Sequence, residues 1–145
     1  MFRFFLLFVT AMLLLACRSP RSTTGVVSTK DSTMLVLEEG QNLFLEREQI
    51  NLTFARLLED SRCPEGVQCV WAGVAAAELT AMGTFTRPQT LVVATADLPD
   101  KGYAKAAVFH RYTFRLTALT PYPAQGDPER AAQKRKIKLT VKAVK

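Results

Sequence analysis

Three segments of the chain, residues 50–55, 112–118 and 137–143, alternate apolar and polar side chains with a period of two. Successive side chains of a β-strand point to opposite faces of its sheet, so this period predicts strands that bury one face. A helix would instead repeat its apolar residues every three or four positions. The pattern therefore favours an all-β fold.

Four shorter apolar runs begin at Met34, Asn42, Val70 and Thr90 and have the length of further strands. Segments that contain glycine or proline separate the runs and supply turn signals. About seven short strands joined by turns are typical of an antiparallel β-sandwich, such as the immunoglobulin-like fold, or of a small barrel. We expect one of these two architectures.

One short helix is also expected. The sequence Asp127-Pro128-Glu129 places an N-cap residue before a proline at the first helical position. Ala131 and Ala132 would continue this helix for a turn or two.

The first residues of the chain have the character of an export signal. One basic side chain, Arg3, precedes an apolar run that is shorter than a membrane-spanning helix. The run ends in Leu14-Leu15-Ala16-Cys17, which resembles the lipobox of bacterial lipoproteins. The resemblance implies that residues 1–16 are a signal peptide and that Cys17 is lipidated, with two or three acyl chains that attach stably to a membrane. An ordinary signal, in which Cys17 has no special role, remains the alternative.

The next segment is rich in serine and threonine and poor in side chains that could form a core. We expect residues 17–33 to comprise the lipidated cysteine and a flexible tether, and residues 34–145 to form the β-sandwich domain. Arg18 stands where lipoproteins retained in the inner membrane of enteric bacteria carry an aspartate. The expected location is therefore the bacterial cell envelope, with the lipid in the outer membrane and the domain facing the periplasm.

The stretch EDSRCPEGVQCVWAG, residues 59–73, contains the other two cysteines, Cys63 and Cys69. Disulfides form in exported proteins, and lipidation of Cys17 would leave these two cysteines as a pair. The residues from Cys63 to Gly66 fit a type I turn that would bring the two sulfurs together. We predict a structural disulfide, with no metal and no cofactor.

Three alternatives to a structural disulfide remain. A thioredoxin-like redox pair has two residues between its cysteines, whereas this pair has five. A closed zinc site needs four ligands, and the chain offers two cysteines and the distant His110. The third alternative is a loop that faces a peptide or a glycan.

The residues around the cysteines form a candidate binding loop. Asp60 is expected to pair with Arg62, and Trp71 to cover the disulfide and seal the edge of the core. Tyr122, which lies between two prolines, is expected to pack against a sheet. The candidate loop residues are Asp60, Arg62, Glu65, Gln68 and Trp71.

The same stretch resembles the pattern D-S-R-C-P-x-x-V-x-C-x-W-x-G of a family of small, uncharacterised bacterial exported proteins and lipoproteins. The later LTALTPYP, residues 116–123, and the final IKLTVK, residues 137–142, are similar to how those proteins end. The resemblance spans Leu43 to Lys142. It implies an all-β domain with a Cys63–Cys69 disulfide, and it implies no catalytic residue.

The net charge of +6 is concentrated at the C-terminal end, where residues 129–145 hold seven basic side chains and one acidic one. The lysines of KIKLTVKAVK alternate with apolar residues, as on an edge strand that lysines protect from aggregation. The alternative is a surface that meets anionic lipid, an anionic glycan or an acidic envelope protein. Nucleic acid is not expected, since no aromatic side chains alternate with the basic ones.

No catalytic residues and no enzymatic activity are predicted. His110 is the only histidine, and Ser61 has no histidine near it in the sequence. Glu59 and Asp60 are adjacent, so an extended chain would point them to opposite faces. Catalysis would require His110 to approach Asp60 or Glu59 in space.

The expected function is that of a cell-envelope lipoprotein with a non-enzymatic binding or structural domain. The alternative is a secreted inhibitor of a hydrolase, such as a lysozyme or a protease, that presents the disulfide loop. An inhibitor of this kind would expose residues 65–68 and bury Trp71. In a purely structural loop, residues 65–68 would pack against neighbouring loops.

Overall fold

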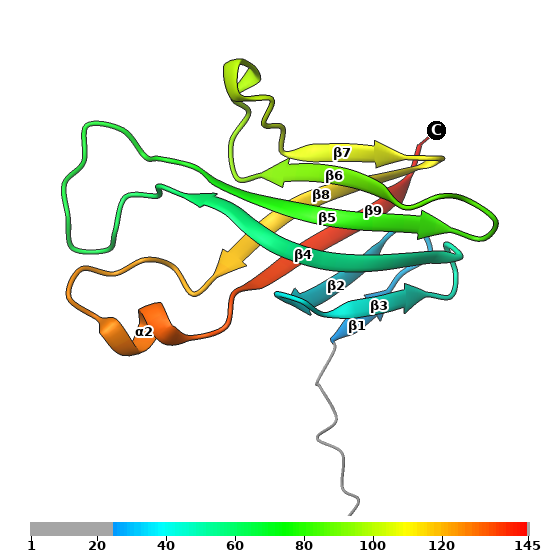
Figure 1. Ribbon diagram of the computed structural model, residues 1–145, viewed down its shortest axis with the longest axis horizontal. Coiled ribbons are helices and arrows are strands. Elements are labelled where there is room, and N and C mark those ends of the chain that lie inside the picture. Colours follow the sequence, from blue (N-terminus) through cyan, green and yellow to red (C-terminus); the bar gives the residue numbers. More distant parts are fainter. Residues whose placement is uncertain (1–24, 145) are drawn as a thin grey trace, which may run out of the picture.

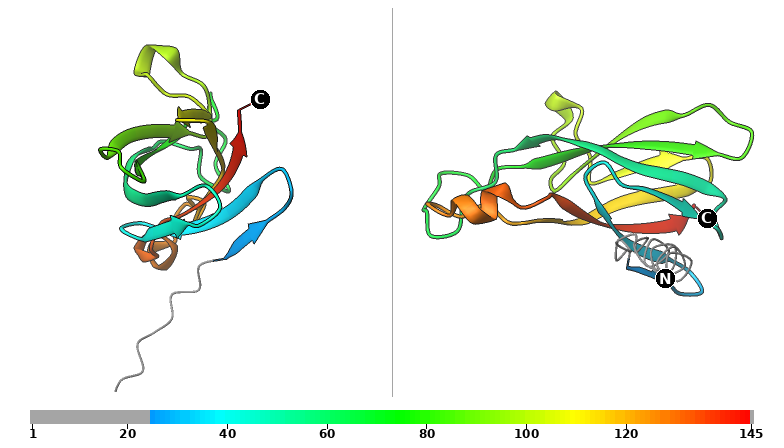
Figure 2. Two further views of the ribbon diagram at one scale, coloured as in Figure 1. Left: turned by 90° about the vertical axis from the view of Figure 1, so that its right-hand side faces the viewer. Right: turned by 60° about the horizontal axis from the view of Figure 1, so that its bottom comes forward.

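The computed structural model describes residues 25–144, so the predicted signal peptide, Cys17 and the first part of the predicted tether lie outside the described residues. The chain folds into two antiparallel sheets of five and four strands, which confirms the all-β sandwich (Figure 1). Seen end-on in Figure 2, the strands curve around a common interior.

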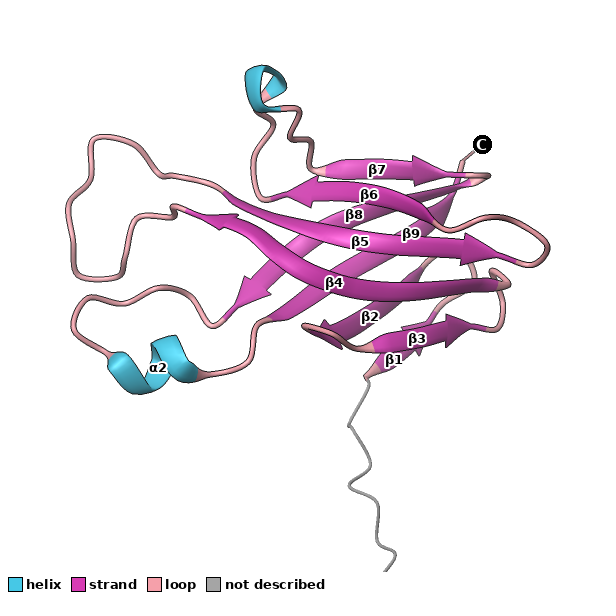
Figure 3. Ribbon diagram, viewed as in Figure 1, coloured by secondary structure: helices cyan, strands magenta, loops and turns pink. Residues whose placement is uncertain are grey.

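The strand order is β1-β2-β9-β8-β7 in the larger sheet and β3-β4-β5-β6 in the smaller one. Long loops leave the strands at one end of the sandwich, between β4 and β5 and between β8 and β9 (Figure 3). The elements are β1 (Val26–Ser28), β2 (Thr33–Glu38), β3 (Asn42–Leu45), β4 (Ile50–Asp60), β5 (Ala75–Gly83), β6 (Gln89–Ala94), η1 (Pro99–Lys101), β7 (Ala106–Phe109), β8 (Tyr112–Thr120), α2 (Pro128–Ala132) and β9 (Lys136–Ala143).

The core lies between the two sheets and is filled by the apolar residues of the period-two pattern. Alternate residues are buried there over part of each strand, as the pattern predicts: Ile50, Leu52 and Phe54 of β4, Phe114 and Leu116 of β8, and Ile137, Leu139 and Val141 of β9. A register shift after Leu116 buries Leu119 in place of the expected Ala118, and Ala143 at the end of β9 is exposed. The largest fully buried side chains are Phe54, Phe109 and Phe114. The alternation therefore identified the core-facing side of these three strands.

Two strands were not expected from the sequence. β1 lies within the predicted tether and pairs with β2, although all three of its residues are exposed. β7 pairs with the first half of β8 and fully buries only Phe109. β1 buries no side chain and β7 is only four residues long, so neither sequence gives a periodic signal.

The start of β5 is buried on both of its faces. Ala75 and Ala77 face the core between the sheets, while Val74 and Ala76 form a second apolar cluster with Ala94. The connection between β6 and β7 covers this second cluster with Ala96, Leu98 and Tyr103. Small side chains at this position let the connection approach the sheet closely.

The position of β9 contradicts the predicted role of its lysines. β9 pairs with β2 on one side and with β8 on the other, so it is the central strand of its sheet. Lysines on a central strand do not protect an edge. The prediction was wrong because the sequence period shows which residues face outward, but not where a strand lies in its sheet.

Helix α2 begins as the sequence predicts. The Asp127 carboxylate accepts a hydrogen bond from the backbone N–H of Arg130 at 2.9 Å, and Pro128 is the first helical residue. Among the described residues, no helix is long and apolar enough to cross a bilayer.

A candidate binding site at the cysteine loop

Residues 61–74, here called the cysteine loop, connect β4 to β5. The two ends of the loop, residues 61–63 and 72–74, are here called its neck. They continue the pairing of the strands by two backbone hydrogen bonds, from Ser61 N–H to the Val74 carbonyl at 2.8 Å and from Cys63 N–H to the Ala72 carbonyl at 2.9 Å. The two arms of the neck are therefore fixed to each other before the loop widens.

Gly73 is required in this neck by space and by backbone angle. Its φ is +72°, in the left-handed region that favours glycine. A Cβ at this position would lie 1.8 Å from the carbonyl oxygen of Ser61 and 2.7 Å from the Cα of Arg62. No side chain fits between the two arms.

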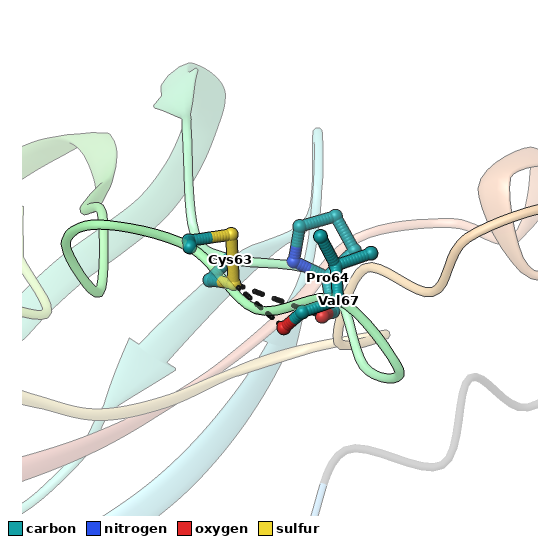
Figure 4. The surroundings of a disulfide bond; sticks show 4 residues. Cys63, Pro64 and Val67 are labelled. Carbon is teal, nitrogen blue, oxygen red and sulfur yellow. Dashed lines mark hydrogen bonds between the residues drawn. A yellow bond between two sulfur atoms is a disulfide. The ribbon is translucent and has the colours of Figure 1, made fainter.

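The disulfide predicted between Cys63 and Cys69 is present, with 5.9 Å between the Cα atoms. The turn inside it is shifted by one residue from the expected one, because the Val67 N–H bonds to the Pro64 carbonyl and Gly66 takes φ = +82° at the third position, as in a type II turn. The Cys63 sulfur lies 3.3 Å from the Val67 carbonyl oxygen, a contact drawn as a dashed line in Figure 4. A disulfide sulfur has no proton to donate, so this is a packing contact.

Arg62 locks the base of the loop to the opposite sheet. Its side chain pairs with both carboxylate oxygens of Asp60 at 2.7 Å, in the expected pairing. Two further N–H groups bond to backbone carbonyls, those of Leu119 at 2.7 Å and Pro121 at 3.1 Å. Only 7% of Arg62 is exposed. The fork geometry of a guanidinium suits this combination of bidentate and backbone contacts.

The loop between β8 and β9 supports the cysteine loop from the side. The Tyr122 ring lies 4.6 Å from the Arg62 guanidinium carbon, in a cation–π arrangement. The Glu65 N–H bonds to the Pro123 carbonyl at 2.9 Å, and the Glu65 carboxylate pairs with Arg130 of α2 at 2.7 Å. Tyr122 thus packs on Arg62 and stays 40% exposed, instead of packing against a sheet as predicted.

A second ionic contact braces the end of β4. The Glu59 carboxylate accepts hydrogen bonds from Lys101 at 2.8 and 2.9 Å, from Ser61 at 3.0 Å and from Tyr103 at 3.2 Å. The bond from Lys101, and then that from Ser61, lowers the pKa of Glu59 below its usual range. The same pairing raises the pKa of Lys101. Glu59 and Asp60 have separate partners, as expected from their adjacency.

The far side of the cysteine loop is exposed and apolar. Val70 is fully exposed, Trp71 is 52% exposed, and Val67 is also exposed. The prediction that Trp71 seals the edge of the core is therefore wrong. The left-handed Gly73 ends the extended conformation before the alternation of β5 begins, and so Trp71 lies in the loop rather than on the core face of that strand.

A hollow of about 410 Å³ opens beside this exposed segment. It lies between the neck of the loop and the end of β8, and its walls are mostly small or apolar side chains. They include Ala72, Ala96, Ala118 and Tyr122, with Arg62 at the base. The exposed side chains of Val67, Val70 and Trp71 are here called the apolar ridge. An apolar ridge next to a hollow is a common form of a surface that contacts another molecule.

The five predicted loop residues divide into two groups. Asp60 and Arg62 satisfy each other and have a structural role, and Glu65 is bonded to the neighbouring loop. Gln68 and Trp71 are exposed and available for contact. The sequence reasoning placed Val67 in the exposed tip of the inhibitor alternative and Tyr122 against a sheet, but it gave no role to Val70, which follows Cys69 directly.

The catalytic arrangement that was considered does not form. His110 lies next to Gly83, which pairs with Ile50 at the start of β4, whereas Asp60 is at the other end of that strand. Ten residues of extended chain separate these ends by roughly 30 Å. Among the described residues, no three His, Cys, Asp or Glu side chains are grouped so that they could hold a metal ion.

No family model, no curated protein and no solved structure matches the chain.

Proposed function

We propose that this chain is a cell-envelope lipoprotein whose β-sandwich is a non-enzymatic binding domain, with the exposed segment of the cysteine loop as its contact surface. The observation that carries the proposal is the exposure of Val70 and Trp71 on a loop whose base is fixed. An apolar and aromatic ridge that is ordered before binding loses little conformational entropy when a partner covers it. The lipobox at Cys17 supports the envelope location.

The partner is expected to be another envelope protein with an apolar pocket. Trp and Tyr are the side chains that most often dominate protein interfaces, and Trp71 of the cysteine loop and Tyr122 of the supporting loop are both exposed. The hollow at Ala72 would take one apolar side chain of the partner in return. The contact is therefore reciprocal, with a ridge and a hollow on one side of the molecule.

Position-specific photocrosslinking in intact envelopes tests the proposal. A photoreactive amino acid replaces Trp71 in one protein and Phe85 in a control, because Phe85 is a fully exposed apolar residue in the turn after β5, at the other end of that strand. We expect one discrete crosslinked product from position 71 and none from position 85. Val70→Asp should abolish the product. Equal products from both positions, or none from position 71, would contradict the proposal.

A hydrolase inhibitor is the second candidate, and the exposure of residues 65–68 on a disulfide-closed loop favours it. The exposed Trp71 and the bonds that tie Glu65 to the neighbouring loop differ from the form expected of a projecting wedge. A screen against muramidases and envelope proteases separates the two candidates. Absence of inhibition at micromolar concentrations of the purified protein would remove the inhibitor.

The envelope location has its own test. Cells grown with a labelled fatty acid should yield labelled protein, and Cys17→Ala should carry no label. Label that persists in the variant would contradict lipidation.

A further inference from the structure

The lysines of β9 lie on the outer face of the five-stranded sheet, at its centre. Lys136, Lys138 and Lys142 are exposed and alternate with the buried Ile137, Leu139 and Val141. Since β9 is flanked by β2 and β8, these lysines face solvent across a broad sheet surface rather than along an edge.

Pairing in the sheet adds one more basic side chain to this surface. Arg115 of β8 pairs with Thr140, which lies between Lys138 and Lys142 on the same face. The four side chains Arg115, Lys136, Lys138 and Lys142 are here called the basic face. Among the outward positions of the five strands the only acidic residue is Glu38, which bonds to Lys136 at 2.9 Å. Four basic residues minus one acidic residue give a net charge of +3.

Three members of the basic face lack an acidic partner within the described part of the chain. No ion pair there involves Arg115, Lys138 or Lys142. Four positions along β9 separate Lys138 from Lys142, a distance of about 13 Å. Three unneutralised cations in so small an area of a flat surface attract an extended anionic surface more effectively than a single small anion.

Exposed apolar side chains border the basic face. Val27 of β1 pairs with Met34 of β2, which pairs with Thr140, so both lie on this outer face. On the other side, Val108 of β7 pairs with Thr113, the neighbour of Lys142. All three are exposed. Basic and apolar side chains on one face are typical of surfaces that bind at a membrane interface.

The chain enters the fold at the edge of this same sheet, at β1 (Figures 1 and 2). Eight residue steps separate Cys17 from Gly25, the first described residue, and even a fully extended chain covers no more than about 28 Å in that number. A lipid on Cys17 would therefore keep the sheet within a few Debye lengths of the headgroups, each about 8 Å at physiological salt.

We propose that the basic face docks the domain against the anionic headgroups of the membrane that holds the lipid, so that the sandwich lies on the bilayer with the five-stranded sheet toward it. The proposed docking depends on lipidation of Cys17, which would keep the domain near the membrane, and on Arg115, Lys138 and Lys142, which would attract the anionic headgroups. Docking through this face leaves the cysteine loop at the end of the sandwich, beyond the strands, where a neighbouring protein can reach it.

Vesicle sedimentation tests the basic face separately from the lipid. The chain is purified from Arg18 onward, which retains all nine described strands and no lipidation site, and is mixed with vesicles of phosphatidylcholine alone or with added phosphatidylglycerol. We expect binding only to the anionic vesicles. Each basic residue near such a surface changes the partition coefficient about fivefold, so Lys138→Gln/Lys142→Gln should weaken binding about 25-fold.

The matched control is Arg56→Gln/Arg87→Gln, which removes the same charge from exposed positions of the smaller sheet and its β5–β6 connection. This control should bind like the parent chain, and binding of the parent should fall sharply when NaCl is raised from about 0.1 M to about 1 M. Equal losses in both double variants, equal binding to neutral vesicles, or binding to soluble acidic polysaccharide in place of vesicles would overturn the proposal. Fatty-acid labelling reports lipidation independently, so failure of the anchor and failure of the face are distinguishable.

Discussion

The Nη1 atom of Arg62 donates a hydrogen bond of 2.7 Å to the carbonyl oxygen of Leu119, 57 positions further along the chain. This bond connects the smaller sheet, to which Arg62 is joined through β4, with β8 of the larger sheet. The same guanidinium holds Asp60, so the base of the cysteine loop depends on one buried cation.

Arg62→Met should destabilise the domain by about 3–5 kcal/mol, because it leaves the Asp60 carboxylate without its partner in a mostly buried position. Arg62→Lys should recover only part of the loss, since an ammonium cannot bond to a carboxylate and two carbonyls in the same fork. Urea unfolding followed by circular dichroism measures both effects. Arg56→Met, at an exposed ion pair, is the control and should change stability little. Equal effects at positions 62 and 56 would refute the structural role of Arg62.

Gly73→Ala should cost at least about 2 kcal/mol of unfolding free energy, since a left-handed non-glycine residue is strained and the new methyl would overlap the Ser61 carbonyl. Gly40→Ala is the matched control. Gly40 has a similar φ of +81° with nothing within 4 Å of its Cβ position, so only the backbone strain of about 1 kcal/mol applies. The difference in urea midpoint between the two variants measures how much stability is lost through the close contact of the new methyl with the neck. A Gly73→Ala protein as stable as Gly40→Ala would show that the neck can open.

Loss of the disulfide through Cys63→Ala/Cys69→Ala should lower stability by about 2 kcal/mol, as expected for a short closed loop. The fold should survive, because the neck and the Arg62 contacts do not depend on the sulfurs. Thermal unfolding with and without reductant measures the change. Mass spectrometry of the native protein should find neither cysteine alkylated before reduction, and alkylation of both would contradict the disulfide.

The contact between Glu59 and Lys101 should make stability depend on pH on the acidic side. The pKa of Glu59 is lowered in the folded state, so its stabilising contribution is complete above its unfolded pKa of about 4.3 and is lost as the pH falls through the lower folded value. The difference in urea midpoint between the parent protein and Glu59→Gln should therefore shrink as the pH is taken from 7 to 3.

Lys101→Gln provides the check on that assignment. It removes the largest cause of the lowered pKa, so the Glu59 carboxyl should titrate closer to its ordinary value when it is followed by NMR. An unchanged titration in Lys101→Gln would mean that another group sets the pKa of Glu59.

The sequence predicted the strands whose side chains alternate over several residues and missed the short strands β1 and β7, which do not. The faces of β4, β8 and β9 followed from their apolar residues, and the start of α2 followed from Asp127 and Pro128. β1 could not be predicted, because its three exposed residues pair with β2 without contributing to the core.

At the candidate site, local chemistry was predictable and long-range contacts were not. The disulfide and the Asp60–Arg62 pair join residues close in sequence, and both are present. The contacts of Arg62 with Leu119 and Tyr122 depend on how two distant loops meet, and nothing in the motif indicates them. The exposure of Trp71 follows from the left-handed backbone angle at Gly73. The sequence pattern predicted one continuous strand from Val70 onward and gave no sign of this break.

The central place of β9 has a consequence for how the protein is made. Thr33 of β2 pairs with Val141 of β9, and Phe114 of β8 pairs with the same residue, so the last of the described strands joins β1 and β2 to the rest of the sheet. A nascent chain that is still emerging holds β2 and β8 as two unjoined edges. The larger sheet can therefore close only after β9 has been synthesised, because β2 and β8 have no pairing with each other.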